Sequence, residues 1–332
     1  MNNTQNRKQS ATQKPRRFIK EKWTALFGIL MVTALPLLLV TLGDLNRPVQ
    51  RGADVDEEQI LMLRHEESRA TERLPFGKIL ALSLAATNAS DTPMESLAAQ
   101  AVALRSRGVW WSDYCPTVGK ADCAKLCDNS SHGLPYLSQG ELMELYGEDE
   151  GIARLERSAK AVESTRGLVL CYDGKVIPAL LHHSSPGNTR SSDQLAWVRS
   201  VTSPESGKQG KYTYTVEETR LCLAAAFGVE LSQKPWEWSM LAEADGVGWV
   251  KTVQIGELTV SGDAFAAALS LPSPCFTLQI QWDGLVVTTV GEGSGCGLSR
   301  EGATLYAGSG LTRWEILGHY FPECTVEALE VT

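Results

Sequence analysis

The stretch Thr92-Pro-Met-Glu-Ser-Leu-Ala-Ala-Gln-Ala-Val-Ala-Leu-Arg105 predicts the helix around which the fold is built. Thr92 can cap the free amides with its hydroxyl, and Pro93 suits the first helical position. The Glu95 carboxylate, at the third position, can reach back to the cap amide. Apolar residues then recur at helical spacing and form one stripe, made of Met94, Leu97, Ala98, Ala101 and Val102.

Small side chains dominate this helix, with alanine at positions 98, 99, 101 and 103. They leave little volume between the helix and the elements that cover it, so we expect a buried, closely packed central helix. Gln100 and Arg105 are the polar groups that such a helix would carry toward a site or a partner.

The N-terminal region is typical of a membrane anchor. Residues 1–22 form a basic tail with seven basic residues and one acidic residue, and the run from Trp23 to Leu42 is uncharged. Twenty helical residues span roughly 30 Å, about one hydrocarbon core. The basic tail predicts a cytoplasmic N-terminus and an extracytoplasmic main domain, in a single-pass protein of the cell membrane. A cleaved signal peptide and a buried helix are the alternatives. The run is long for a signal peptide, and a poor cleavage sequence follows it.

The segment 43–73 is polar and charged and is interpreted as a solvated stalk that leads into the fold. The main domain is expected from 74 to 330. The run Ile79–Ala86 is apolar, and its periodicity alone does not distinguish a strand from a helix.

The net charge of the chain after its basic tail limits the partners that it can bind. The chain of 332 residues has a net charge of −8, of which the tail contributes +6, so the remainder carries −14. This balance argues against nucleic acid, because phosphate binding needs a basic surface. All eight cysteines follow the predicted anchor. They permit disulfides but are too few for a disulfide scaffold, and most are expected to be buried as small apolar residues.

A cluster of potential metal ligands follows the central helix as Cys115-x7-Cys123-x3-Cys127-x4-His132. Thiolates and an imidazole this close in sequence could hold zinc. The spacing matches no standard zinc module, so three unrelated cysteines beside a loop histidine remain the alternative.

A β-hairpin is predicted from Val169 to Ala179, where two β-rich runs flank Asp173-Gly174. The run His182-His-Ser-Ser-Pro-Gly-Asn-Thr-Arg190 follows directly. Polar side chains at the end of a strand are typical of a site on a rigid element, but a polar loop fits the same residues.

Several strands and a glycine-rich segment follow. Strands are predicted at 250–255, 276–281 and 284–290, and helical turns at 302–310 and 312–320. Between them, Gly291-Glu-Gly-Ser-Gly-Cys-Gly297 has glycine at alternate positions, which would allow backbone to approach a ligand or another segment closely. We therefore expect one α+β domain with a central buried helix and an antiparallel-type sheet.

Motifs along the chain resemble the stage II sporulation protein D family, which includes the amidase enhancers. The resemblance extends from about Ile79 to Pro322. The motifs that carry it are Pro93–Ser106, Ala161–Ala179, His182–Ser185, Gly262–Phe265, Leu269–Phe276, Gly291–Ala303 and Glu315–Pro322. The family's enzymes are membrane-anchored lytic transglycosylases that cut the glycan strands of peptidoglycan during engulfment in sporulation. The resemblance implies that the chain has the fold of this family and that its substrate class is peptidoglycan.

The chain departs from the family at positions of chemical importance. The resemblance implies a glutamate general acid six residues before Pro93, where this chain has Thr87. A hydroxyl cannot supply the proton that cleavage of a glycosidic bond requires. The family's glycine-rich block has a histidine and a glutamine where this chain has Ser294 and Arg300. Gly133 replaces a cysteine of the family's metal site, which Cys127 and His132 do fit, with Cys123 or Cys115 as a substitute ligand.

Two functional hypotheses follow. In the first, the protein binds peptidoglycan, or assists a wall hydrolase or another sporulation membrane protein, without cleaving glycan. Its groove would be lined by Gln100 and Arg105 from the helix and by His182, Ser184, Ser185 and Ser294. In the second, it is an active lytic transglycosylase whose acid has moved, with Asp91 the better substitute because Glu95 is the expected capping residue.

The cysteine cluster gives a direct test for zinc, the only cofactor that the sequence suggests. If zinc binds, Cys127 and His132 are ligands and Cys123 is the third, which leaves one coordination position open. We expect about one zinc per chain in the purified protein, its loss in Cys127→Ser, and its retention in the control Cys275→Ser. Elemental analysis under reducing, metal-replete conditions measures this, and zinc-free wild-type protein would contradict the hypothesis.

Overall fold

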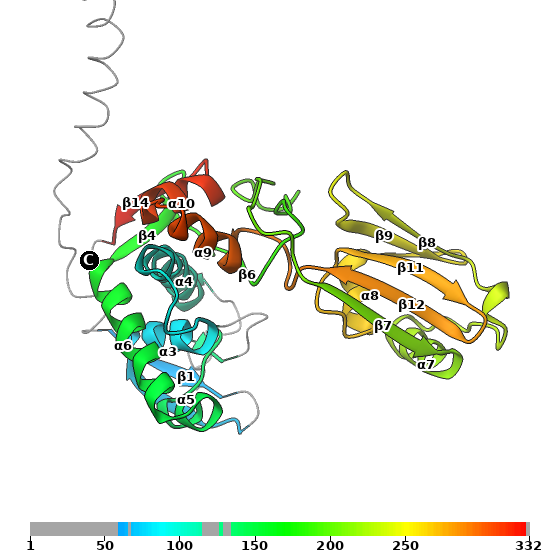
Figure 1. Ribbon diagram of the computed structural model, residues 1–332, viewed down its shortest axis with the longest axis horizontal. Coiled ribbons are helices and arrows are strands. Elements are labelled where there is room, and N and C mark those ends of the chain that lie inside the picture. Colours follow the sequence, from blue (N-terminus) through cyan, green and yellow to red (C-terminus); the bar gives the residue numbers. More distant parts are fainter. Residues whose placement is uncertain (1–58, 66–67, 115–125, 129–133, 330–332) are drawn as a thin grey trace, which may run out of the picture. The chain divides into compact units, whose positions relative to one another are not determined.

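The computed structural model describes residues 59–65, 68–114, 126–128 and 134–329, and Figure 1 shows their arrangement. The described residues form an α+β fold with eight α-helices and several small sheets. The predicted basic tail and anchor lie outside the described residues. Among the helices that the structure does describe, none combines the length and apolar character that a membrane span requires.

The central helix is confirmed. Helix α4 (Met94–Tyr114) is buried without interruption from Ser96 to Val109. It contacts α3 (Phe76–Thr87), α6 (Glu148–Ser164), α9 (Arg300–Gly308), α10 (Arg313–Tyr320) and β4 (Leu168–Tyr172). The alanines at 98, 99, 101 and 103 are fully buried, so small side chains let these elements approach α4 from several sides.

The N-terminal end of α4 differs from the prediction. The first backbone bond of the helix is donated by Leu97 to the Pro93 carbonyl, so Pro93 rather than Thr92 flanks the helix. Glu95 does not reach back to the cap. Its carboxylate binds Arg313 at the start of α10, with Oε2 accepting from Nε at 2.9 Å and Oε1 from Nη2 at 2.7 Å. A bidentate pair with arginine is a stronger interaction for this carboxylate than a single bond to an amide.

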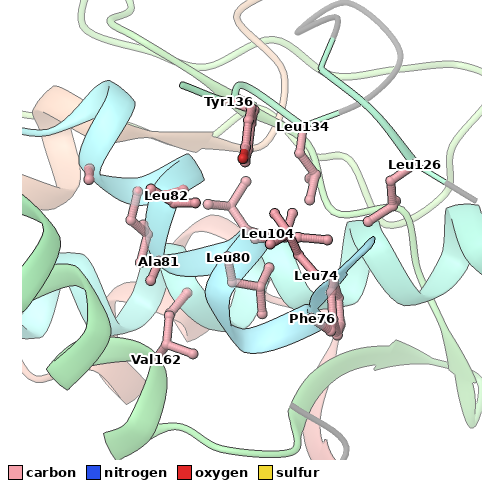
Figure 2. Packing of buried hydrophobic residues seen from close by; sticks show 14 of the residues in the cluster. Leu74, Phe76, Leu80, Ala81, Leu82, Leu104, Leu126, Leu134, Tyr136 and Val162 are labelled. Carbon is pink, nitrogen blue, oxygen red and sulfur yellow. The ribbon is translucent and has the colours of Figure 1, made fainter. Parts of the chain in front are cut away.

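The first core cluster packs between α3 and α4. The apolar run Ile79–Ala86, for which the sequence left strand and helix open, is helical, because Phe76–Thr87 forms α3. Figure 2 shows Leu80 and Leu82 of α3 with Leu104 of α4, Tyr136 and Val162, all of which are buried. Helix α5 (Gln139–Tyr146) begins with a capping box between Ser138 and Glu141.

The predicted stalk requires a correction, because its last part belongs to the fold. Residues Ile60–Arg64 and Thr71–Pro75 form the antiparallel strands β1 and β2, and β3 (Leu126–Cys127) pairs with β1 in parallel. Leu61 and Leu63 are buried in the first core cluster and alternate with the exposed Ile60 and Arg64 and the half-buried Met62. This period of two, within Ile60-Leu-Met-Leu-Arg64, is the strand signal that the surrounding charges obscured.

The predicted hairpin is confirmed. Strand β4 pairs with β5 (Lys175–Val176) across Asp173 and Gly174, whose φ values of 50° and 69° are both positive. Such a turn favours Asp-Gly, because two left-handed residues are needed in succession. Strand β14 (Thr325–Ala328) pairs with the other edge of β4.

A second group of strands forms two antiparallel sheets, ordered β11-β12-β7 and β10-β9-β8. The strands predicted at 250–255, 276–281 and 284–290 are confirmed with these bounds. The elements of this group are β7 (Gln209–Thr215), α7 (Val216–Phe227), the short 3-10 helix η1 (Pro235–Glu237), β8 (Met240–Ala244), β9 (Val250–Ile255), β10 (Leu258–Ser261), α8 (Gly262–Ala268), β11 (Phe276–Gln281) and β12 (Gly284–Val290). Buried residues such as Leu223, Val253, Phe265 and Leu285 form their core.

The glycine-rich segment 291–297 lies directly against the segment 180–185, as its glycines predicted. Its four glycines all have positive φ, between 74° and 97°. A Cβ at Gly291 would lie 2.7 Å from the Ser184 carbonyl oxygen, and one at Gly293 would lie 2.8 Å from His182 Cβ. Strand β13 (Leu298–Ser299) then pairs in parallel with β6 (Leu181–His182). The glycines thus serve close backbone packing.

We expect Gly297→Ala to destabilise the protein by about 2–4 kcal/mol, through its positive φ and a collision of the new methyl group with the Leu180 carbonyl. Gly308→Ala is the matched control, because no atom lies within 4 Å of a Cβ there. Urea unfolding measures both. Equal unfolding midpoints for the two variants would contradict the packing role of the glycines.

Candidate functional site

A pocket of about 660 Å³ brings several predicted site residues together. Its wall combines the end of α3 and the loop that follows, the His183–Ser184 segment, the start of β7, and the first residues of α9. The residues that line it are Thr87, Asn88, Ala89, Asp91, Thr92, His183, Ser184, Lys208, Gln209, Gly210, Tyr212, Pro272, Thr289, Gly291, Glu292, Arg300, Glu301, Thr304 and Leu305.

Thr87 lies on the pocket wall, but its hydroxyl is used locally. Its Oγ1 donates to the Ser83 carbonyl at 3.0 Å, one turn back in α3. The same oxygen accepts from Asn88 Nδ2 at 3.2 Å. A hydroxyl bonded to its own helix has no proton to give a bridging oxygen, so Thr87 offers no acid chemistry at this position.

Gln100 ties the loop after α3 to α4. Its side-chain amide and that of Asn88 exchange two hydrogen bonds of 2.9 Å each, and both residues are buried. Gln100 Nε2 also donates to Ser96 Oγ at 3.1 Å. Gln100 faces the smaller neighbouring cavity rather than the pocket, and it fixes the loop that follows Thr87 and carries Asp91.

Arg105 does not line the pocket. It is fully buried, and its guanidinium donates to the carbonyls of Val162 at 3.1 Å and Leu168 at 3.2 Å. These carbonyls lie in and just after α6, so Arg105 joins the central helix to α6 and to the start of β4. The expectation that the helix carries this arginine toward a groove is therefore not met.

The acidic groups of the pocket are exposed. Asp91, the proposed substitute acid, lines the pocket from the loop before α4, and Glu292 and Glu301 line it from the other side. A carboxyl acting as a general acid is usually held in a desolvated setting that favours its protonated form. These three carboxyls have no such setting.

The polar residues His182–Ser185 lie partly in the pocket wall and partly in the interior of the fold. His183 and Ser184 line the pocket, whereas His182 and Ser185 point into the fold. Burial lowers the pKa of His182 to about 4, partly opposed by its bond to the Cys296 carbonyl. The neutral ring donates from Nδ1 to that carbonyl at 3.1 Å, and its buried Nε2 has no partner among the described residues.

Ser294, a predicted groove residue, does not line the pocket. Its Oγ accepts a bond of 3.3 Å from the Cys296 amide, within the glycine-rich segment. The neighbouring residue Glu292 lines the pocket instead.

Glu205 is a buried carboxylate that the sequence did not single out. Its Oε1 accepts from the Ser185 amide at 2.9 Å and from the Ser185 hydroxyl at 2.6 Å, and its Oε2 accepts from Ser203 Oγ at 2.6 Å. Ser299 Oγ also donates to Oε1. Burial alone would raise the pKa of Glu205, but the hydrogen bonds from Ser185, Ser203 and Ser299 hold it below the usual value. The serines come from three separate segments, so no local pattern reveals this cluster.

The predicted zinc ligands lie mostly outside the described residues, namely Cys115, Cys123 and His132. Cys127 is described and ends β3, beside Arg64 of β1. In the part of the chain that the structure describes, no group of three or more histidine, cysteine or acidic side chains is placed to hold a metal ion. The zinc hypothesis therefore stays a prediction.

Comparisons with known proteins show sequence similarity to sporulation proteins. A family model described as Stage II sporulation protein matches residues 64–172, which include α3, α4 and the loop between them. The chain is 27% identical to Stage II sporulation protein D of Bacillus subtilis (strain 168) over 283 residues, or 83% of this chain and 82% of the relative. It is 26% identical to the protein of the same name from Bacillus amyloliquefaciens, over 76% and 74% of the two chains. The chain is thus similar to two proteins named Stage II sporulation protein D over most of its length.

We expect Glu205→Gln to lower the free energy of unfolding at pH 7 by about 2–3 kcal/mol, because charge-assisted bonds are replaced by neutral ones. The folded pKa of Glu205 is lowered, so this stabilisation is present above 4.5, the ordinary value, and is lost as the pH falls below it. Thermal unfolding from pH 3 to 8 should show the gap between wild type and variant closing in acid. A constant gap, or an equal effect of the exposed control Glu144→Gln, would contradict this role.

Proposed function

We propose that this protein binds peptidoglycan glycan in the pocket beside α4, or presents it to a wall hydrolase, without cleaving it. The observation that carries the proposal is the state of Thr87. It lies on the pocket wall at the position where the resemblance implies a glutamate acid, and its hydroxyl is bonded to its own helix. The pocket keeps its polar wall while lacking a carboxyl at that point.

The composition of the pocket suits an oligosaccharide. A volume of about 660 Å³ lies within the range of ligand pockets. Its wall offers the exposed ring of His183, the phenol of Tyr212 and the cation of Lys208, which can bond sugar hydroxyls and acetamides. None of these contacts requires proton transfer to a bridging oxygen.

The alternative is an active lytic transglycosylase with a relocated acid. Asp91 favours it, because this residue lies four positions beyond Thr87 and lines the same pocket. Glu292 and Glu301 are further carboxyls of the pocket. Their exposure weighs against all three, since the acid of a glycan-cleaving enzyme is normally held in a desolvated site.

The anchor and the partners are part of the same proposal. Residues 23–42 would hold the protein in the cell membrane with residues 59–329 outside, near the wall. A membrane-bound glycan-binding protein of this kind could hold strands for a separate hydrolase or act beside another sporulation membrane protein. Zinc, if bound by Cys127, His132 and Cys123, would keep one coordination position open for water or for a partner's group.

Muropeptide analysis after incubation with purified sacculi tests the proposal. We expect no anhydro-muropeptides from the wild type and retention of the protein on sacculi in a pull-down. General acid catalysis contributes roughly 10² to 10⁴ in rate, and Thr87→Glu should recover little of it because Ser294 and Gly133 also differ from the family's pattern. Anhydro-muropeptides released by the wild type and lost in Asp91→Ala, but not in the exposed control Glu144→Ala, would identify an enzyme with a relocated acid. Failure to bind sacculi would overturn the binding function.

A further inference from the structure

Strand β7 forms one edge of the sheet ordered β11-β12-β7. It packs against β12 on one side and against α7, which follows it in the chain (Figure 1). The opposite edge of the sheet, at β11, contacts η1 and β8. In the part of the chain that the structure describes, β7 is therefore the edge of this sheet that no further strand covers.

The backbone groups of β7 alternate between β12 and the outer edge. Just before the strand begins, the Lys208 carbonyl accepts from the Gly291 amide at 3.0 Å. Antiparallel strands exchange such bonds at every second residue, so the bonds to β12 come from Gly210, Tyr212 and Tyr214. The odd-numbered residues of β7 consequently direct their amides and carbonyls away from β12.

The outward groups are satisfied only at the C-terminal end of the strand. At Thr215, side chains from the first turn of α7 bond both the amide and the carbonyl. The outward amides and carbonyls of Gln209, Lys211 and Thr213 have no hydrogen-bond partner among the described residues, and all three residues are exposed. The edge thus offers three donors and three acceptors at the spacing of a β-ladder, which an extended chain can bond.

The side chains along this edge favour an acidic occupant. Lys211 lies at the centre of the three outward residues and Lys208 precedes the strand, and neither forms an ion pair within the described residues. At physiological ionic strength, exposed charges farther apart than roughly 8 Å are largely screened, so these two ammonium groups outweigh the negative net charge of the chain. Carboxylates on an added strand would lie beside them, and opposite charges on neighbouring strands are stabilising.

The same lysine argues against a second copy of this chain. Two copies of β7 use all three outward residues only in an antiparallel pairing centred on Lys211, which sets this residue opposite its own copy. Like charges directly opposite each other on paired strands are destabilising, and charged side chains are a common means of preventing edge-to-edge association. The lysine therefore discourages self-pairing and leaves the edge to a strand of opposite charge.

We propose that the outer edge of β7 binds an extended, acidic segment of a partner protein, which adds a fourth strand to this sheet. Backbone bonds to Gln209, Lys211 and Thr213 supply the affinity, and the lysines supply the preference for acidic sequences. This inference goes beyond the proposed glycan-binding function, because Lys211 and Thr213 do not line the pocket.

Peptide binding by the full-length protein in detergent tests the proposal. The probe is a fluorescent heptapeptide of alternating glutamate and valine, which matches the seven residues of β7. One control peptide replaces every glutamate by lysine, and the other carries a methyl group on every backbone amide. We expect the acidic peptide to bind about tenfold more tightly than either control, as measured by fluorescence anisotropy.

Two variants test the edge itself. Thr213→Pro removes one outward amide and obstructs the added strand, while proline is tolerated where an edge strand directs its amide outward. Lys211→Glu reverses the charge at the centre of the edge. Each should weaken binding of the acidic peptide about tenfold. The matched controls are Thr259→Pro, at an exposed position of edge strand β10, and Lys251→Glu, at an exposed position of β9, and both should bind as the wild type does.

The outcomes are decisive for this edge. Absence of acidic-peptide binding by the wild type, or undiminished binding by Thr213→Pro that circular dichroism shows to be folded, would overturn the proposal. If Thr213→Pro does not fold, undiminished binding by Lys211→Glu overturns it instead. A dimer in analytical ultracentrifugation that Lys211→Glu or Thr213→Pro dissociates would assign the edge to a second copy and overturn the partner.

Sacculus pull-down separates this inference from the proposed function. Thr213→Pro should be retained on sacculi as the wild type is, because Thr213 lies outside the pocket wall. Retention of this variant together with loss of acidic-peptide binding supports the β7 edge as a separate site. Wild-type protein that binds the acidic peptide but not sacculi would overturn the glycan function and support the edge.

Discussion

The buried carboxylate of Glu205 is the interaction on which the arrangement around the pocket depends. It accepts hydrogen bonds from Ser185, Ser203 and Ser299, and no cation is paired with it in the described residues. Burying an unpaired carboxylate costs several kcal/mol unless hydrogen bonds replace its lost hydration. The bonds form only when three segments meet, so the carboxylate favours their correct assembly over partly folded alternatives. Glycine is required at position 302 beside this cluster, because a side chain there would collide with Tyr320 and Ser203.

The position of the pocket follows from this cluster. Ser185 ends the segment that carries His183 and Ser184, and Ser299 begins α9, which carries Arg300 and Glu301. The glycine-rich segment packs against the same backbone from the other side, through bonds from His183 and Ser184 to the Glu292 carbonyl. On the opposite wall, the paired amides of Asn88 and Gln100 fix the loop after α3 to α4. Buried polar contacts thus set both walls of the pocket.

The sequence predicted what depends on local patterns. The apolar periodicity after Pro93, the Asp173-Gly174 turn and the glycines at alternate positions each act over a few residues, and each is confirmed. The sequence did not predict the contacts between side chains that lie far apart along the chain. Arg105 and Glu95 are polar residues on a central helix, but their partners lie in α6, near β4 and in α10, which spacing along the helix cannot reveal. The strand at Ile60–Arg64 was hidden by neighbouring charges, and Glu205 sits in a segment with no pattern at all.

The residues that hold the pocket together are largely separate from those that face it. Glu205, the glycines and the Asn88–Gln100 pair are satisfied inside the fold. A change at Thr87 leaves their contacts in place, apart from the bond that Asn88 Nδ2 donates to the Thr87 hydroxyl. A carboxylate at position 87, beside the two paired amides, would need its own hydrogen bonds or a cation, whereas threonine is satisfied by the Ser83 carbonyl. Catalytic groups are commonly held at a cost in stability, and that cost disappears when the group is lost. The hydrogen bonds that hold the two walls of the pocket therefore do not depend on a carboxylate at position 87.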